Sequence, residues 1–180
     1  MRINKNDTLA IIVDYQERLM PAMADMEGFI KKSAILIEGL NILGVPMLVT
    51  QQYTKGLGQT VEPIRNAIGN DEYFDKTSFS VLGDEAIATA ISSQNKKNII
   101  LCGAEAHICV LQTLIDLREK GYNVVLVEDC IASRCVENKA IALVRAEQEG
   151  ALISTYEAIL YELLEKAGSD EFKQISRLIK

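Results

Sequence analysis

Residues 98–110 read Asn-Ile-Ile-Leu-Cys-Gly-Ala-Glu-Ala-His-Ile-Cys-Val, a pattern that joins a buried strand to a helix through a short turn. The apolar run 98–103 is typical of a parallel strand that is covered on both faces. Residues 104–108 form a turn that overlaps the first residues of the helix expected over 107–120. Cys109 lies where this helix begins. Unpaired N–H groups and the positive end of the helix dipole favour the thiolate there, and the thiolate is the nucleophilic form of cysteine. Cys109 is therefore our first candidate nucleophile, and a small core residue is the alternative.

The same alternation of apolar runs and amphipathic segments continues on both sides of this stretch. It predicts one domain over residues 1–180 with an α/β fold, in which a three-layer, doubly wound, mostly parallel sheet carries helices on both faces. The segment 51–79 is a long irregular connection with a short helix near 62–68, and its length favours a functional loop. We expect strands at 8–13, 45–50, 98–103, 123–127 and 151–154, and helices at 28–43, 84–92 with Asp84 as N-cap, 107–120, 137–149, 156–166 and 170–178.

The composition excludes several classes of protein. The net charge is −6 without a basic stripe, so we expect no nucleic-acid partner. No apolar run approaches the length of a membrane span, so we expect no membrane partner. The first residues lack the apolar middle of a signal peptide, which predicts a cytoplasmic protein. With one histidine and no second cysteine pair, we expect no metal and no cofactor, and we expect free thiols at all four cysteines, Cys102, Cys109, Cys130 and Cys135.

Ligands of open parallel sheets bind beyond the carboxyl ends of the strands. Chain order alone therefore predicts that four segments meet at one edge of this sheet. They are Asp14, residues 51–53, residues 103–109 and Asp129.

A base is needed beside Cys109. The only histidine, His107, lies two residues before it, and helical residues at that spacing point apart. Asp14 ends a buried strand, where a carboxylate is costly unless it is paired. It is the best-placed base, with an N-cap role as the alternative. Lys76 would then keep the carboxylate and a thiolate from repelling each other, and a solvated surface charge is its alternative.

The chain resembles the isochorismatase-like cysteine hydrolases, which include nicotinamidases and N-carbamoylsarcosine amidases. The resemblance spans about residues 8 to 160 and comes closest to the branch of isochorismatase domain-containing proteins. The matching pieces are Ile-Ile-Val-Asp14-Tyr-Gln16, Lys76-Thr-Ser-Phe-Ser, Gly103-Ala-Glu-Ala-His-Ile-Cys109-Val, Glu128-Asp129-Cys-Ile-Ala-Ser133-Arg134 and Ser154-Thr155-Tyr-Glu157.

The resemblance implies a catalytic triad of Asp14, Lys76 and Cys109. It also implies a cis peptide bond between Ala104 and Glu105 and an oxyanion hole formed by the backbone N–H groups of Glu105 and Cys109. The alternative for Glu105 is that its side chain is only a local hydrogen-bond acceptor. Nicotinamidases hold a metal with an Asp and two His after the second strand, but residues 51–79 contain no histidine. True isochorismatases often lack the cysteine, so its presence favours hydrolysis of an amide-type C–N bond through a thioester.

Three other interpretations stay open. One is hydrolysis of a vinyl ether, for which Arg18, Lys55 and Arg134 are the available cations. Another is a non-catalytic, regulatory homo-oligomer with the same fold. The last is a thiol redox sensor in which Cys109 meets another of the cysteines.

The predicted partner is a small-molecule substrate, and the resemblance also implies a homo-oligomer, either a dimer or a tetramer. Residues 159–164 are a candidate subunit surface or ordinary core. Five residues are candidates for contact with the substrate, each with a loop or packing role as its alternative: Gln16, Gln52, Tyr53, Phe79 and Ile108.

Overall fold

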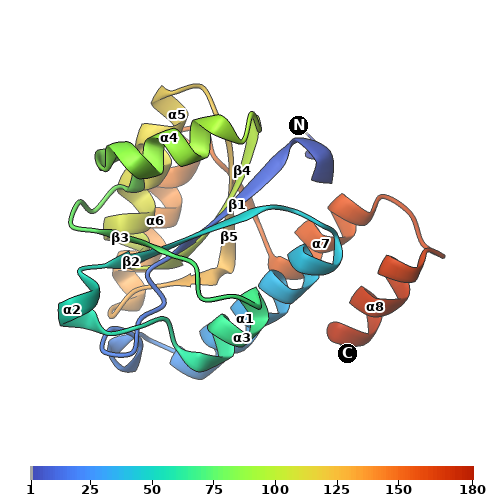
Figure 1. Cartoon of the computed structure of the whole chain (residues 1–180), viewed down its shortest axis with the longest axis horizontal. Coiled ribbons are helices and arrows are strands. Elements are labelled where there is room, and N and C mark those ends of the chain that lie inside the picture. The colour runs from blue at the N-terminus through green and yellow to red at the C-terminus, as the bar shows by residue number, and fades with distance from the viewer. Residues whose placement is uncertain (1) are drawn as a thin grey trace.

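Six parallel strands form one sheet in the order β3-β2-β1-β4-β5-β6 (Figure 1). The computed structural model describes residues 2–180. The order places β1 and β4, the two central strands, side by side, as in a doubly wound sheet. The strands are β1 (Thr8–Val13), β2 (Met47–Gln52), β3 (Phe74–Lys76), β4 (Asn98–Ala104), β5 (Asn123–Ala132) and β6 (Leu152–Ser154).

Helices cover both faces of the sheet and make the fold three-layered (Figure 1). Each face has its own buried apolar cluster, which holds the helices to the sheet. Within residues 2–180, no helix is both long and apolar enough to cross a membrane. One face carries α1 (Met26–Ile42), α3 (Glu62–Ile68), α7 (Tyr156–Leu164) and α8 (Asp170–Leu178), the other carries α4 (Glu85–Ser93), α5 (Leu111–Glu119) and α6 (Val136–Gln148), and the short α2 (Thr54–Leu57) follows β2.

The predicted architecture is confirmed, with the predicted strands and helices in place. Asp84 is the N-cap of α4, since its carboxylate accepts hydrogen bonds from the backbone N–H groups of the first turn. The edge strand β3 was not predicted, because it has three residues and its sequence Phe-Asp-Lys has no apolar run.

Two details near the expected ligand edge differ from the sequence prediction. Strand β5 continues to Ala132 through a shift in register opposite β4. Asp129 therefore lies inside a strand, and its carboxylate accepts the backbone N–H of Tyr156, the first residue of α7, at 2.9 Å. Cys109 does not begin an α-helix, because Ala106–Val110 forms a π-helical turn that leads into α5.

A glycine is required where β4 passes β1. Gly103 has φ of +137° and lies opposite Val13 in the parallel pairing. A Cβ atom at this position would collide with the carbonyl oxygen and the side chain of Val13. Gly103 therefore allows β1 and β4 to stay paired up to the residues that precede Asp14 and Cys109.

We predict that Gly103→Ala lowers the free energy of unfolding by at least about 3 kcal/mol, because backbone strain and overpacking add. Gly121→Ala is the matched control, since Gly121 also has a positive φ (+85°) but no atom within 4 Å of an added Cβ. It should cost about 1 kcal/mol. Urea unfolding curves measure both values, and equal losses in the two variants would contradict this account of β1–β4 packing.

Candidate active site

A buried ion pair joins the ends of β1 and β3. Asp14 follows β1 directly with φ of +56°, and Lys76 is the last residue of β3. The Lys76 Nζ lies 2.8 Å from Asp14 Oδ2, and both side chains are 0% exposed. The other oxygen, Asp14 Oδ1, accepts the Thr50 hydroxyl at 2.8 Å. The carboxylate is thus used inside the site and not as a helix N-cap.

The Lys76 ammonium has further acceptors around it. Nζ donates to Gln52 Oε1 at 2.7 Å and approaches the carbonyl oxygens of Ser78 at 3.2 Å and Phe79 at 3.3 Å. An ammonium has three hydrogens to donate, so these oxygens and Asp14 satisfy it completely. Lys76 is therefore a buried, paired charge and not a solvated surface lysine.

The thiol of Cys109 faces this ion pair from the π-helical turn. Burial, then the negative charge of Asp14, raises the pKa of Cys109 from 9.0 to about 12, while Lys76 and the backbone N–H of Glu105 act in the opposite direction. The helix start favours the thiolate, but desolvation and the carboxylate neighbour act against it and favour the protonated thiol.

The groups around the ion pair also shift the pKa of Asp14. Burial raises the pKa of Asp14 above its ordinary 3.8, and Lys76, Thr50 and the Cys109 thiol oppose that rise. A carboxylate with a raised pKa is a stronger base than an ordinary one, and its bond to Lys76 favours the ionised form. The pair of Asp14 and Cys109 can thus move a proton from sulfur to oxygen.

The peptide bond between Ala104 and Glu105 is cis, at the position that the resemblance implies. The backbone N–H of Glu105 faces the sulfur of Cys109 and favours its charged form. The Glu105 side chain has a separate task, because its oxygens accept the backbone N–H of Arg134 at 3.0 Å and the Arg134 Nε at 3.1 Å. These contacts hold the turn against the end of β5.

His107 points away from the thiol. Its Nδ1 lies 2.9 Å from the Ser133 hydroxyl, and its Nε2 lies 3.4 Å from the side-chain nitrogen of Asn138. The imidazole is therefore engaged with β5 and α6 and does not pair with Cys109.

Two of the expected substrate contacts are used inside the protein. Gln16 is 0% exposed, and its amide bonds to the backbone of Gln52 and Gly58. Gln52 bonds to Lys76 and, through Nε2, to the carbonyl oxygen of Thr77 at 2.8 Å. A buried amide whose hydrogens are both donated to protein has none left for a ligand. The geometry of Gln16 therefore differs from the expected substrate contact.

Tyr53 and Phe79 have exposed side chains near the ion pair, each 53% accessible. The Tyr53 N–H donates to the Lys76 carbonyl oxygen at 2.8 Å, and the Phe79 carbonyl oxygen accepts from Lys76 Nζ. Ile108 precedes Cys109 and is partly buried. These three residues have side-chain surface that a ligand can reach.

Sequence reasoning missed one polar group of the site. Thr50 is buried on β2, directly opposite Val13 on β1, and its hydroxyl fixes one oxygen of Asp14. The only signal was its place at the carboxyl end of an apolar run, which many threonines share.

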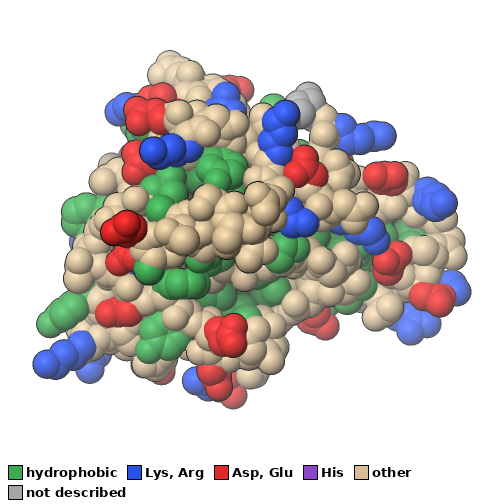
Figure 2. All heavy atoms as spheres, turned by 45° about the horizontal axis from the view of Figure 1, so that its top comes forward, with side chains coloured by type: hydrophobic (Ala, Val, Ile, Leu, Met, Phe, Trp, Pro, Cys, Tyr) green, Lys and Arg blue, Asp and Glu red, His purple; other side chains and the backbone are tan. Residues whose placement is uncertain are grey.

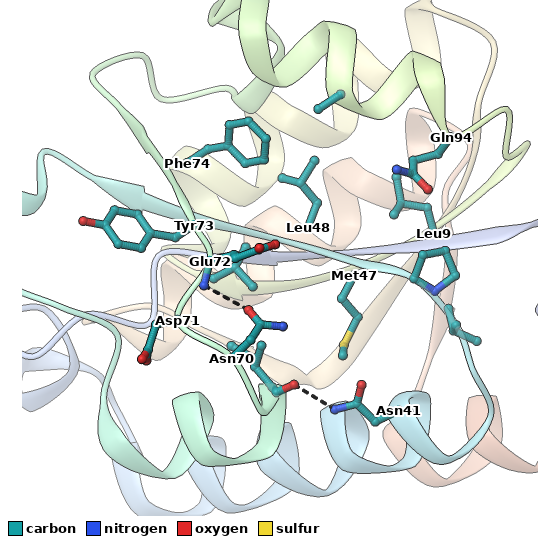
Figure 3. A pocket seen from close by; sticks show the side chains of 15 residues that line it. Leu9, Asn41, Met47, Leu48, Asn70, Asp71, Glu72, Tyr73, Phe74 and Gln94 are labelled. Atoms are coloured by element: carbon teal, nitrogen blue, oxygen red, sulfur yellow. Dashed lines mark hydrogen bonds between the residues drawn. The ribbon is translucent and has the colours of Figure 1, made fainter.

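A groove lies elsewhere on the molecule. It has a volume of about 660 Å³ and runs along the start of β2, with Leu9, Met47 and Leu48 on one side and residues 70–74 on the other (Figure 3). Neither Asp14 nor Cys109 contributes to it. The part of the chain that the structure describes also has no group of three His, Cys, Asp or Glu side chains arranged as metal ligands.

Comparisons with known proteins identify the family of the chain. A family model described as the isochorismatase domain matches residues 8–158. The secreted isochorismatase effector Isc1 of Phytophthora sojae is 35% identical over 99% of this chain and 87% of its own length. The isochorismatase domain-containing protein 1 of Salmo salar is 35% identical over 96% of this chain, which spans only 61% of that relative.

A solved structure extends the comparison to three dimensions. The structure of a protein named MAR1 ribonuclease from Caenorhabditis elegans superposes with a TM-score of 0.92 at 36% identity, over 99% of this chain and 92% of that one. The family model and these relatives match almost the whole sheet and the segments that carry Asp14, Lys76 and Cys109. The chain therefore belongs to the isochorismatase family.

Proposed function

We propose that this chain is a cysteine hydrolase that cleaves an amide-type C–N bond of a small molecule. One observation carries the proposal: a buried carboxylate that is paired with a lysine lies against the thiol of Cys109. Membership of the isochorismatase family supports hydrolase activity. Within that family assignment, the roles of Asp14, Lys76 and Cys109 and the bond that is cleaved are our proposal.

In the first half of the reaction, Asp14 takes the proton from the Cys109 sulfur as that sulfur attacks the carbonyl carbon of the amide. The protonated Asp14 then gives this proton to the leaving nitrogen, and the C–N bond breaks to leave a thioester. In the second half, Asp14 removes a proton from water, the hydroxide attacks the thioester, and the C–S bond breaks. The sulfur recovers the proton from Asp14.

Negative charge on the carbonyl oxygen needs donors during both attacks. We assign this task to the backbone N–H groups of Glu105 and Cys109. The backbone N–H of Glu105 lowers the pKa of Cys109, and this interaction near the attacking sulfur supports the proposal. A donor of this kind contributes on the order of 3–4 kcal/mol in acyl-transfer enzymes.

Two of the three candidate cations lack a carboxylate partner. Arg134 is paired with Glu105. Arg18 donates to the neutral carbonyl oxygen of Gly56 at 2.7 Å and keeps its charge, and Lys55 lies on α2. Lys76 is fully engaged within the site. Arg18 and Lys55 are therefore available to an anionic vinyl ether such as isochorismate, and its hydrolysis is the second candidate function.

Ribonuclease activity is the alternative that the name of the nematode relative raises. Two features of this chain oppose it. The net charge is −6, and on the face seen in Figure 2 lysine and arginine side chains are interspersed with acidic ones instead of forming a stripe. The single histidine is bound to Ser133 and does not reach Cys109. RNA binding depends on a basic surface, which this face lacks.

We also propose that the chain forms a homo-oligomer. The support is a set of branched side chains on α6 that are exposed to solvent, namely Val136, Ile141 and Val144. Light scattering tests this, and a monomer at micromolar concentration would contradict it.

A purely regulatory role is disfavoured, because nothing in such a role requires a lysine and an aspartate to be buried against a thiol.

We predict that Cys109→Ala abolishes hydrolysis of every small amide that the wild-type protein cleaves, because no other thiol faces Asp14. Cys135→Ala is the matched control, since Cys135 is an exposed cysteine 26 positions further along the chain. It should leave kcat unchanged. A screen of neutral primary amides with ammonia detection measures both, and turnover by folded Cys109→Ala would refute the mechanism.

We predict that Asp14→Asn lowers kcat by about 10²–10⁴-fold while KM stays close to the wild-type value, because a base is lost and the shape is kept. Asparagine tolerates the left-handed backbone of this position. If the uncompensated lysine unfolds this variant, the double variant Asp14→Asn/Lys76→Met restores neutrality and should show the same loss. A normal kcat in either variant would exclude Asp14 as the base.

We predict that kcat falls on the acidic side of its pH profile, at a pH above the range in which an ordinary aspartate titrates. We call this fall the acidic limb. The active form of Asp14 is the carboxylate, and burial raises the pKa of Asp14, so activity falls as the pH drops through that raised value. Lys76 lowers the same pKa. In Lys76→Met the limb should therefore move to higher pH. Profiles between pH 4 and 9 test this, and a limb that moves to lower pH would contradict the pairing.

A further inference from the structure

We propose that Gln52 is a positioning residue that aims the Lys76 ammonium at Asp14, and that Gln16 in turn fixes Gln52. This inference rests on the proposed function, and it assigns a role to two residues that do not belong to the triad. Three hydrogen bonds connect Gln16, Gln52 and Lys76 in series, from the end of β1 across β2 to the end of β3.

The Gln52 side chain has both of its ends occupied. Its Oε1 accepts from Lys76 Nζ at 2.7 Å, which is as short as the bond from Nζ to Asp14 at 2.8 Å. Its Nε2 donates to the carbonyl oxygen of Thr77 at 2.8 Å, so the oxygen of the amide, and not the nitrogen, is turned towards the ammonium. The donor side of the amide thus sets the orientation of its acceptor side.

Gln16 holds the backbone from which this side chain projects. Its Oε1 accepts the Gln52 N–H at 2.7 Å, and its Nε2 donates to the Gln52 carbonyl oxygen at 3.0 Å. A second bond from Nε2 to the Gly58 carbonyl oxygen, at 2.8 Å, ties in the loop after β2. With 0% exposure, Gln16 acts only through these protein contacts.

Lysine has a long flexible stem, so a single bond to Asp14 leaves several positions open to the ammonium. The carbonyl oxygens of Ser78 and Phe79 are weaker restraints, at 3.2 and 3.3 Å. The hydrogen bond to Gln52, which lies on β2, restricts the position of the ammonium. A fixed ammonium holds Asp14 as the ionised base, whereas a displaced one leaves the carboxylate less stabilised.

Three titratable groups lie near the Lys76 ammonium. Asp14 lies at the end of β1, the Cys109 thiol lies in the π-helical turn, and Asp75 is the neighbour on β3. Asp75 is exposed and bonded to Thr54 at 2.7 Å, so it does not compete with Asp14 for the ammonium. A change at Gln52 should therefore act mainly on the pKa of Asp14.

The test compares Gln52→Met with Gln51→Met. Both changes remove an amide from β2 and keep the length of the side chain. The Gln51 amide bonds to Thr60 at 2.9 Å and makes no contact with Lys76. The measured quantity is the rate at which iodoacetamide alkylates Cys109 between pH 4 and 9, by peptide mass mapping, which needs no substrate.

We expect Gln52→Met to slow alkylation about tenfold or more, the effect of a lost hydrogen bond to a charged group. Its acidic limb should move to higher pH, because Lys76 lowers the pKa of Asp14 and would do so less. Gln51→Met should match the wild type. With an amide that the protein cleaves, Gln52→Met should lower kcat and leave KM within about threefold. If Gln52→Met does not fold, Gln52→Asn withdraws the same oxygen and should give the same changes.

A wild-type rate and limb in folded Gln52→Met would overturn the inference. A raised KM with normal kcat would do so as well, because it would make Gln52 a substrate contact. Failure of the proposed function looks different. In that case no amide is cleaved by the wild type, while the alkylation profiles still separate Gln52→Met from Gln51→Met.

Discussion

The buried ion pair between Lys76 and Asp14 is the constraint on which the rest of the site depends. Two charges removed from water lose hydration worth several kcal/mol each, and their attraction compensates only when the remaining hydrogen-bonding capacity is filled. The chain fills it with the hydroxyl of Thr50, the amide of Gln52 and carbonyl oxygens after β3. Several strands must therefore end at the same edge before the pair can form.

The ion pair also determines how the thiol is activated. A cysteine near free backbone N–H groups favours the thiolate, but Cys109 is buried beside a carboxylate, and its pKa rises to about 12. Burial favours the protonated form of the thiol, and Lys76 favours the ionised form of Asp14. Activation then consists of proton transfer during attack, and the proton stays within reach for the leaving nitrogen.

Much of this was predictable from the sequence. Apolar runs of five or six residues gave β1 and β4, and their parallel order predicted that Asp14 and Cys109 meet at one edge. The three-residue strand β3 was missed, because it has no hydrophobic pattern. The protonation of Cys109 depends on burial, and the task of Gln52 depends on which end of its amide faces Lys76. Residue spacing predicts neither the protonation of Cys109 nor the task of Gln52. Asp129 was misplaced because a register shift extends β5 beyond it.

The most direct test of the account is the alkylation rate of each cysteine at pH 7 in the wild type and in Asp14→Asn. Cys135 is exposed, Cys109 is 7% exposed, and Cys102 and Cys130 are buried. By exposure alone, Cys135 should react fastest. The account predicts that Cys109 reacts fastest in the wild type, and that this advantage is lost in Asp14→Asn. An inert Cys109, or one equally reactive without Asp14, would contradict the claim that the carboxylate takes the thiol proton.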